Sequence, residues 1–465
     1  MQVESCSIVN LTMSQESKPS PVRSASKIGV AIGGLLVAFP ALLFYGILLR
    51  IAVNLPVLDN YGGLDFMNRL VVLKGFPAKL AFLFTAQFNE YKLIFAESIW
   101  WLQYSLSGHI NFRVLNVISN GLVLLLAILL WKMFLPNCKN LGTRLALFIP
   151  VSWLLFQLQY FEMLNWGGAG LQHIASAVFA FAAIYLLFDK SRIAFCSAIL
   201  SFLLAVASSP NGFLLLPIGL LILAPGRHYT RVATWLVASA SLIAVYIYHY
   251  DVHSSQASPD HSVLSAVLKM RPLYILSFMG SAAGIPFHAA SFVLGTVLCV
   301  FFLWIAHKGY AKRNPLVSSC VLFLLLTAIG VAGIRSDLGL EGSVSSRYTF
   351  FSIMFVIFAW FILAEEFVQH KRGRLLESGT YLSAVTIAVL FCLFMDLLGS
   401  IVMKNWNGKI IEGMTVFEHP NPPGSTEGPV ILRTEDERRL AALHPPSRAI
   451  LIESMKLGVY QPPAL

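Results

Sequence analysis

Charged residues are scarce in this chain. Only 12% of its 465 residues are Asp, Glu, Lys or Arg, whereas 57% are hydrophobic, and the mean hydropathy is +0.72. A soluble globule of this composition would expose apolar patches far beyond the normal size. The composition therefore excludes an ordinary soluble domain and predicts an integral membrane protein.

Cysteine is also sparse, and its placement excludes a disulfide scaffold. Of the six cysteines, Cys6 lies in the N-terminal tail and Cys138 in a loop expected on the cytoplasmic side. The others lie within apolar runs, at Cys196, Cys299, Cys320 and Cys392. No zinc-ligand spacing results from these positions.

Several catalytic motifs are missing as well. The chain has no Gly-x-Ser-x-Gly elbow, no phosphate-binding P-loop, no His-Glu-x-x-His and no dinucleotide fingerprint. It therefore lacks the templates of common hydrolases, nucleotide-driven enzymes, zinc peptidases and dehydrogenases.

Long apolar runs are what the chain has in abundance. A bilayer span takes roughly 20 apolar residues, and runs without two-residue alternation exclude an outer-membrane barrel. We therefore predict an all-α polytopic membrane protein with about 11 transmembrane helices. The predicted spans are Ile28–Val53, Val114–Leu135, Leu145–Leu164, Leu171–Phe188, Ile193–Ser208, Gly212–Ala224, Val232–Tyr248, His288–Ala306, Val317–Ile334, Tyr348–Leu363 and Leu382–Met403.

Lys and Arg gather in alternate connections between these spans, whereas the opposite short connections, residues 165–168 and 208–211, carry none. Because cytoplasmic loops are enriched in basic residues, we predict a cytoplasmic N-terminal tail (1–27), a membrane core (28–403) and an extracytoplasmic C-terminal tail (404–465). The net charge of +10 is then a topology signal rather than evidence for nucleic acid. The first run is too long for a signal peptide and is expected to remain, whether translation starts at Met1 or Met13.

The first extracytoplasmic loop, residues 54–113, holds the most unusual residues. Asp59-Asn60-Tyr61-Gly62-Gly63-Leu64-Asp65 predicts a turn with two carboxylates, and Asn89-Glu90-Tyr91-Lys92 follows later. Between them, Met67–Leu73 and Phe76–Phe88 have the apolar spacing of helices that lie in the membrane surface. This layout predicts that Asp59 and Glu90 approach each other in one pocket at that surface.

Four short motifs share the predicted extracytoplasmic face. They are Asn89-Glu90-Tyr91-Lys92, Asn165-Trp166-Gly167, Ser209-Pro210-Asn211-Gly212-Phe213 and Ser345-Ser346-Arg347-Tyr348. With the long first loop and an Asp shortly after the first span, their order resembles the GT-C class of glycosyltransferases over about residues 28–403. The resemblance implies an enzyme of the bacterial inner membrane that transfers a single sugar from a polyprenyl-phosphate donor to a cell-surface glycan or a protein such as pilin. The missing nucleotide-binding segment favours the same lipid-linked donor.

The resemblance also implies roles for individual residues. Asp59 is the expected general base, with Glu90 as a second catalytic carboxylate. The family often has an acidic pair where Asn60 stands here, so metal use stays open: Mg²⁺ or Mn²⁺ would be held by Asp59 with Asp65 or Glu90. The residues expected to bind substrate and phosphate are Lys92, Lys269, Arg271, Arg335, Arg347 and Tyr348. The expected donor and acceptor pocket adds Asp65, Asn89, Glu162, Asn165 and Trp166.

Structural interpretations compete with these roles. Asp59 could cap a helix or end a turn, Arg347 could snorkel at a helix end, and Lys269 and Arg271 could contact lipid headgroups. His173 is expected to be an interior hydrogen-bonded residue.

The competing functions are a lipid-linked glycan flippase or transporter, and a glycan ligase or polymerase. Transporters usually show internal repeats and ionisable residues near the bilayer midplane. No repeat is evident in this chain, and its ionisable residues cluster toward the predicted outer surface. Single-sugar transfer is therefore preferred.

Two further segments carry structural predictions. The C-terminal tail predicts helices at Glu435–Leu443 and Ser447–Leu457 and is expected to pack on the first loop. The loop of residues 251–287, with its semi-apolar part Tyr274–Pro286, predicts a lid or re-entrant segment over a groove for the prenyl chain.

Overall fold

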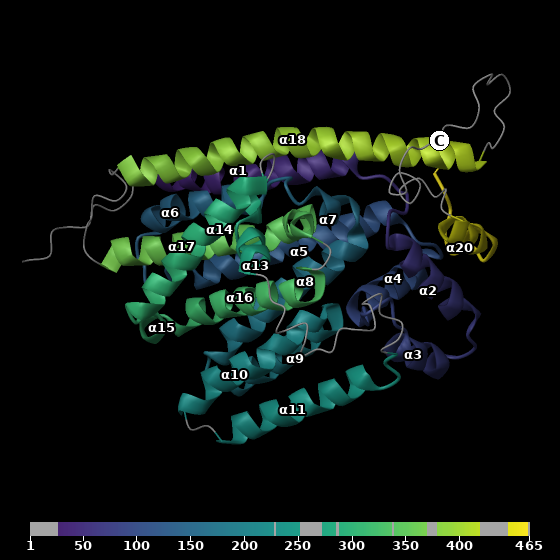
Figure 1. Cartoon of the computed structure of the whole chain (residues 1–465), viewed down its shortest axis with the longest axis horizontal. Coiled ribbons are helices and arrows are strands. Elements are labelled where there is room, and N and C mark those ends of the chain that lie inside the picture. Colours follow the sequence, from purple (N-terminus) through teal and green to yellow (C-terminus); the bar gives the residue numbers. More distant parts are fainter. Residues whose placement is uncertain are drawn as a thin grey trace, which may run out of the picture.

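The computed structural model describes residues 27–226, 229–251, 272–284, 288–336, 339–369, 379–418 and 445–463. Across these ranges the regular structure is helical, and extended pairing is limited to two isolated bridges (Figure 1). The predicted helix Glu435–Leu443 and the residues Lys269 and Arg271 lie outside the described ranges.

Eight helices are long and apolar enough to cross a bilayer by length and composition. They are α1 (Lys27–Ile51), α5 (Phe112–Met133), α8 (Gly167–Leu187), α11 (Tyr229–Ile247), α14 (His288–His307), α16 (Pro315–Arg335), α17 (Ser346–Gln369) and α18 (Gly379–Glu418). The chain is thus a polytopic helical membrane protein, as predicted.

The predicted count of about eleven spans is not confirmed, because three predicted spans coincide with shorter apolar helices. These are α6 (Leu141–Leu155), α9 (Arg192–Ser208) and α10 (Leu215–Leu223), the last flanked by the 3₁₀ turns η1 (Pro210–Leu214) and η2 (Ala224–Gly226).

The predicted span Leu145–Leu164 is interrupted. After α6, residues 156–160 form a buried non-helical segment before the short helix α7 (Phe161–Asn165). Irregular backbone inside a membrane protein needs internal hydrogen-bond partners. Asp396 of α18 supplies one, because its carboxylate accepts the N–H of Leu158 at 3.0 Å. Gly399 permits this approach, since a Cβ there would lie 2.6 Å from the Leu158 carbonyl oxygen.

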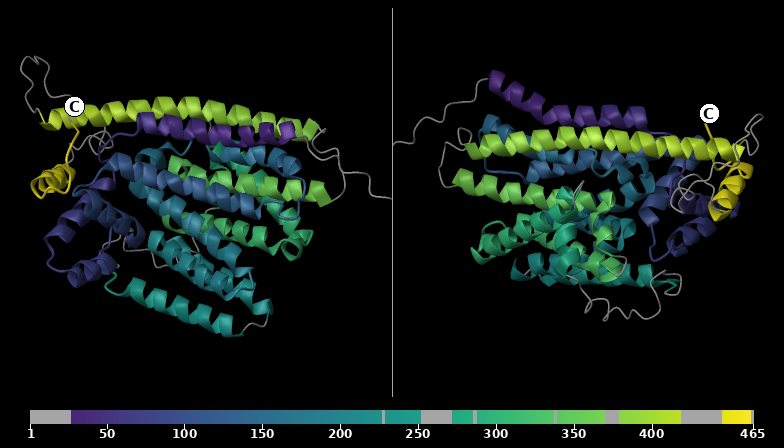
Figure 2. Two further views of the ribbon diagram at one scale, coloured as in Figure 1. Left: turned by 180° about the vertical axis from the view of Figure 1, so that it is seen from behind. Right: turned by 45° about the horizontal axis from the view of Figure 1, so that its top comes forward.

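The spans form a bundle in which α8 and α17 are the most enclosed. The long helix α18 runs beside α1 along one edge, and the largely exposed α11 runs along the opposite edge (Figures 1 and 2). α18 continues unbroken across residue 404, the predicted boundary between membrane core and tail, to Glu418.

One end of the bundle carries the first loop, which folds into α2 (Asn60–Val72), α3 (Phe76–Thr85) and α4 (Ile94–Ser107). The C-terminal helix α20 (Pro445–Lys456) packs on α2 at this end (Figure 1). Hydrogen bonds join Asn68 Nδ2 to the Ile450 carbonyl at 3.3 Å and the Tyr460 hydroxyl to the Asn54 carbonyl at 2.8 Å. The predicted packing of the tail on the first loop is confirmed.

The paired glycines do not form the predicted turn, because both lie within the first turn of α2. A Cβ on Gly62 would lie 2.1 Å from the Phe88 ring, and one on Gly63 would lie 2.5 Å from the Trp100 ring. Glycine is therefore needed here for close packing of two aromatic rings on the helix.

A helical hairpin packs against the bundle between α11 and α16 in the sequence. It comprises α13 (Pro272–Met279), the turn η4 (Ser281–Ala283) and α14. Gly295 lets the two helices touch at their backbones, since a Cβ there would lie 1.7 Å from the Leu276 carbonyl oxygen. α13 also packs on α16, on α17 and on the turn η6 (Leu340–Val344).

Candidate functional site

The first loop and the connection between α16 and α17 meet at the polar end of the bundle. Phe88 and Tyr91 exchange backbone hydrogen bonds of 2.8 and 2.9 Å around a tight turn, in which Asn89 has a left-handed φ of 49°. Asn tolerates this conformation better than most residues. The turn places Glu90 and Tyr91 against Arg335, the last residue of α16.

Glu90 and Arg335 form an ion pair, and Arg335 Nη2 also donates to the Tyr91 hydroxyl at 2.8 Å. The side chains are 19% and 29% exposed for Glu90 and Arg335. Burial raises the pKa of Tyr91 well above its usual range, so this hydroxyl is neutral. The predicted second catalytic carboxylate and one predicted phosphate ligand therefore neutralise each other in this structure.

Asp59 has no such partner. It occupies the N-cap position of α2, yet its side chain makes no capping hydrogen bond, and no ion pair to it occurs among the described residues. The residue is exposed, although desolvation by the surrounding protein still raises the pKa of its carboxyl. The positive charges of Arg347 and Arg335 oppose this rise, and the negative charge of Glu90 adds to it. These four side chains therefore lie within electrostatic reach of one another.

Arg347 is the unpaired cation of this group. It lies in the first turn of α17, with its guanidinium carbon 5.9 Å from the Trp166 ring centre and 5.4 Å from that of Tyr348. Its Nε is buried without a hydrogen-bond partner, and no carboxylate pairs with it in the part of the chain that the structure describes. A guanidinium held by aromatic rings and left without an acid is suited to bind an oxyanion.

Glu162 of α7 holds the start of α17. Its Oε2 accepts the Ser345 hydroxyl at 3.0 Å and the Arg347 backbone N–H at 3.2 Å, while its own N–H donates to Ser346 Oγ at 3.0 Å. A carboxylate at a helix N-terminus satisfies free N–H groups and complements the helix dipole. Glu162 therefore fixes the backbone position of Arg347.

Of the remaining predicted site residues, Tyr348 lies beside Arg347, whereas Asn165 contacts α18. Tyr348 is buried, and its ring lies 5.2 Å from Phe278 of α13 and 6.3 Å from the half-buried His173, whose expected hydrogen bond is not seen among the described residues. Asn165 instead ties α7 to α18, because its Nδ2 donates to Asn407 Oδ1 at 2.9 Å.

Two predicted ligands lie elsewhere. Lys92 is completely buried, and its ammonium donates to the Phe84 carbonyl at 3.1 Å and to the Tyr248 carbonyl. It therefore joins the ends of α3 and α11, and the predicted phosphate contact does not fit this geometry. Asp65 forms an exposed ion pair of 3.0 Å with Arg69, one turn later on α2.

Metal binding by Asp59 with Asp65 or Glu90 stays a prediction. In this structure Glu90 is paired with Arg335 and Asp65 with Arg69. Within the described ranges, no three His, Cys, Asp or Glu residues gather in a way that could hold a metal ion. Asp59 and Arg347 are the two charged groups of this cluster without an ion-pair partner among the described residues.

Two buried carboxylates were not predicted as site residues. Glu97 of α4 is buried with Oε2 unpartnered, and burial raises its pKa to about 8. Asp396 is buried in α18, where it also lies 3.6 Å from the Cys392 thiol. A lone acid in the apolar run Leu382–Met403 was the available signal for Asp396.

Comparison with known proteins adds no relative. No protein-family model, no curated protein and no solved structure matches the chain.

Proposed function

We propose that the protein is a membrane glycosyltransferase that moves a single sugar from a polyprenyl-phosphate donor to an extracytoplasmic acceptor. One observation carries the proposal: at the polar end of a membrane bundle, the Asp59 carboxylate and the Arg347 guanidinium lie within electrostatic reach, and neither forms an ion pair with a described residue. Each group is therefore free to contact a different part of the substrates.

The two groups match the two requirements of the transfer. Asp59 accepts the proton of the acceptor hydroxyl as the hydroxyl oxygen bonds to C1 of the sugar. The bond between C1 and the donor phosphate oxygen breaks, and the electron pair leaves with the polyprenyl phosphate. Arg347 binds that phosphate and stabilises its developing charge. A single displacement of this kind inverts the configuration at C1.

The position of the site supports a lipid-linked donor. Trp166 and Tyr348, which flank Arg347, begin the spans α8 and α17, so the guanidinium lies at the end of the apolar layer. A phosphate bound there leaves its prenyl chain next to the membrane. The acceptor, a surface glycan or a protein such as pilin, would approach from the side of the first loop.

Deletion of the gene followed by mass spectrometry of surface glycans and pilin tests the proposal in cells. We expect one glycan to lose a single sugar residue, and the wild-type gene or the Asp65→Asn variant to restore it. Asp59→Asn should not restore it while reaching the membrane in equal amount. An unchanged glycan profile in the deletion strain would contradict the proposal.

A second candidate, a flippase for a lipid-linked glycan, is favoured by one observation. Asp396 is a buried carboxylate within a span, beside the irregular segment 156–160, and both features are common along transport pathways. A flippase would move the intact lipid across a vesicle membrane and would lose this activity in Asp396→Asn. Cleavage of the sugar–phosphate bond would decide for the transferase.

A further inference from the structure

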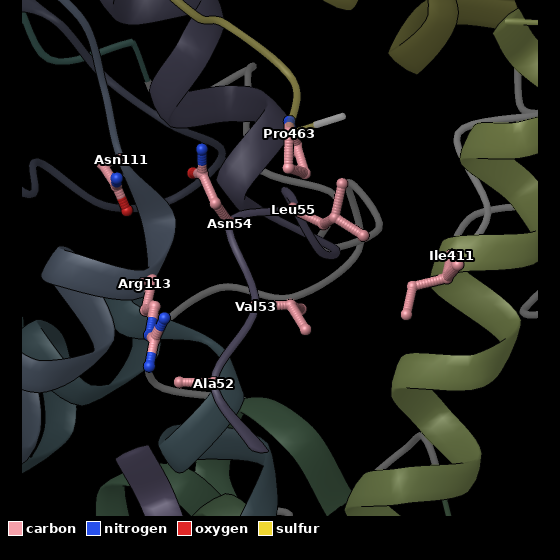
Figure 3. Close-up of a pocket in the computed structure, with 8 residues that line it drawn as sticks. All are labelled: Ala52, Val53, Asn54, Leu55, Asn111, Arg113, Ile411 and Pro463. Atoms are coloured by element: carbon pink, nitrogen blue, oxygen red, sulfur yellow. The ribbon is translucent and has the colours of Figure 1, made fainter. Parts of the chain in front are cut away.

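A cavity of about 450 Å³ lies where α1 ends (Figure 3). Its walls come from the start of the first loop, the N-terminus of α5, α18 and the C-terminal peptide. The residues that line it are Ala52, Val53, Asn54, Leu55, Asn111, Arg113, Ile411 and Pro463.

The chemistry of the cavity is apolar with one cation. Val53 and Leu55 point across it toward Ile411 (Figure 3). The two lining amides are already used: Asn54 Oδ1 accepts the Phe112 N–H at 2.8 Å, and Asn111 Oδ1 accepts the Val114 N–H at 3.2 Å. Arg113 is the charged member of the lining set.

Arg113 retains capacity to bind an anion. One of its terminal nitrogens donates to the Leu49 carbonyl at 2.8 Å, and no carboxylate pairs with it in the described ranges. A guanidinium has five N–H donors, and this residue is exposed. Most of its donors are therefore open to a ligand.

The position of the cavity relative to the membrane indicates the kind of ligand. It lies at the end of α1 and the beginning of α5, two helices long enough to span the bilayer, and so at a membrane–water boundary. C-terminal to Arg113, one face of α5 carries an exposed apolar stripe of Val114, Ile118 and Leu125. A cation above an apolar stripe complements a phosphate attached to acyl chains.

We propose that this cavity binds one phospholipid, with the headgroup phosphate on Arg113 and the upper part of one acyl chain between Val53, Leu55 and Ile411. The lipid would join α18 and the C-terminal peptide to α1 and α5. This proposal is independent of the proposed sugar transfer, because none of its residues belongs to the site around Asp59 and Arg347.

Native mass spectrometry of the full chain, purified in mild detergent, tests the proposal. We expect one retained phospholipid on the wild-type protein and on Lys74→Gln, a control at an exposed cation of the first loop that does not line the cavity. Arg113→Gln, which loses the phosphate contact, and Ile411→Trp, which fills the cavity and keeps the cation, should each lower lipid occupancy at least about tenfold.

A delipidated sample distinguishes the contribution of the headgroup phosphate from that of the acyl chains. Phosphatidylglycerol should raise the midpoint of thermal unfolding in the wild type, whereas diacylglycerol and inorganic phosphate should raise it little. Equal lipid retention by wild type, Arg113→Gln and Ile411→Trp would overturn the proposal. Equal stabilisation by diacylglycerol or by inorganic phosphate would also overturn it.

Discussion

At the scale of residues, Arg335 and Arg347 flank one short connection but differ in their partners. Arg335 is paired with Glu90, whereas Arg347 contacts aromatic rings and no acid among the described residues. The sequence indicated both as phosphate ligands, because it shows residue types but no distances. The pairing favours a structural role for Arg335, and the proposed contact with substrate phosphate rests on Arg347.

This difference predicts opposite outcomes for two matched variants. Arg347→Gln should lower kcat/KM for the lipid-linked donor by about 10²-fold or more, with little change in thermal unfolding, because no ion pair is lost. Arg335→Gln should lower the unfolding midpoint, because Glu90 is left partly buried without its partner. Equal losses of stability in both variants would contradict the assignment.

The raised pKa of Asp59 predicts the pH dependence of the reaction. A general base is active when deprotonated, so the rate should fall as the pH drops through the pKa of Asp59, at a value above the ordinary one of about 3.9. Arg347→Gln removes a charge that lowers this pKa, so its acid limb should move to higher pH. Profiles of kcat/KM against pH measure both effects. An acid limb that stays in place in Arg347→Gln would argue against Asp59 as the base.

Glu97 predicts a pH effect on stability. Burial raises its pKa from an ordinary value of 4.5 to about 8, so the folded state holds a proton that the unfolded state releases between these values. The contribution of Glu97 to stability is therefore fully present below about pH 4.5 and is lost as the pH rises to about 8. Glu97→Gln should be more stable than wild type at pH 8 by about 2–4 kcal/mol and nearly equal at pH 5.

Thermal unfolding at the two pH values measures this difference. Asp65→Asn, at an exposed carboxylate of the same loop, serves as the control and should leave the pH dependence unchanged. Parallel curves for wild type and Glu97→Gln would show that the buried carboxyl does not govern stability.

At the scale of elements, run length and hydropathy predicted most helices but not their interruptions. The break after Leu155 depends on Asp396, far away in the sequence, which accepts the freed N–H of Leu158. The paired glycines looked like turn residues because their contacts with Phe88 and Trp100 come from folding of the whole loop. Local patterns cannot show either contact.

The buried ammonium of Lys92 is predicted to stabilise the packing of two helices. Its ammonium joins the ends of α3 and α11, and α11 is otherwise largely exposed. Lys92→Met should lower the free energy of unfolding by about 1–3 kcal/mol, because two carbonyls lose a charged donor. The KM for the donor should not change. Lys74→Met, at an exposed position, is the control; a raised KM in Lys92→Met with unchanged stability would restore the predicted phosphate role.

At the scale of the whole molecule, the segments expected on one face of the membrane do meet at one end of the bundle. The first loop contacts the connection between α16 and α17 through Glu90 and Arg335, and it contacts the C-terminal helix through Asn68. Alternation of basic and non-basic connections was enough to predict this grouping. The cytoplasmic side of the N-terminus remains a prediction from the same pattern.

Sugar transfer by Asp59 is tested most directly by release of polyprenyl phosphate from a radiolabelled polyprenyl-phosphate sugar, with the purified protein in lipid nanodiscs. We predict turnover by wild type and by Asp65→Asn, and a loss of at least about 10³-fold in Asp59→Asn with an unchanged unfolding midpoint. Turnover by Asp59→Asn at the wild-type rate would contradict the claim that Asp59 is the base of a sugar transfer.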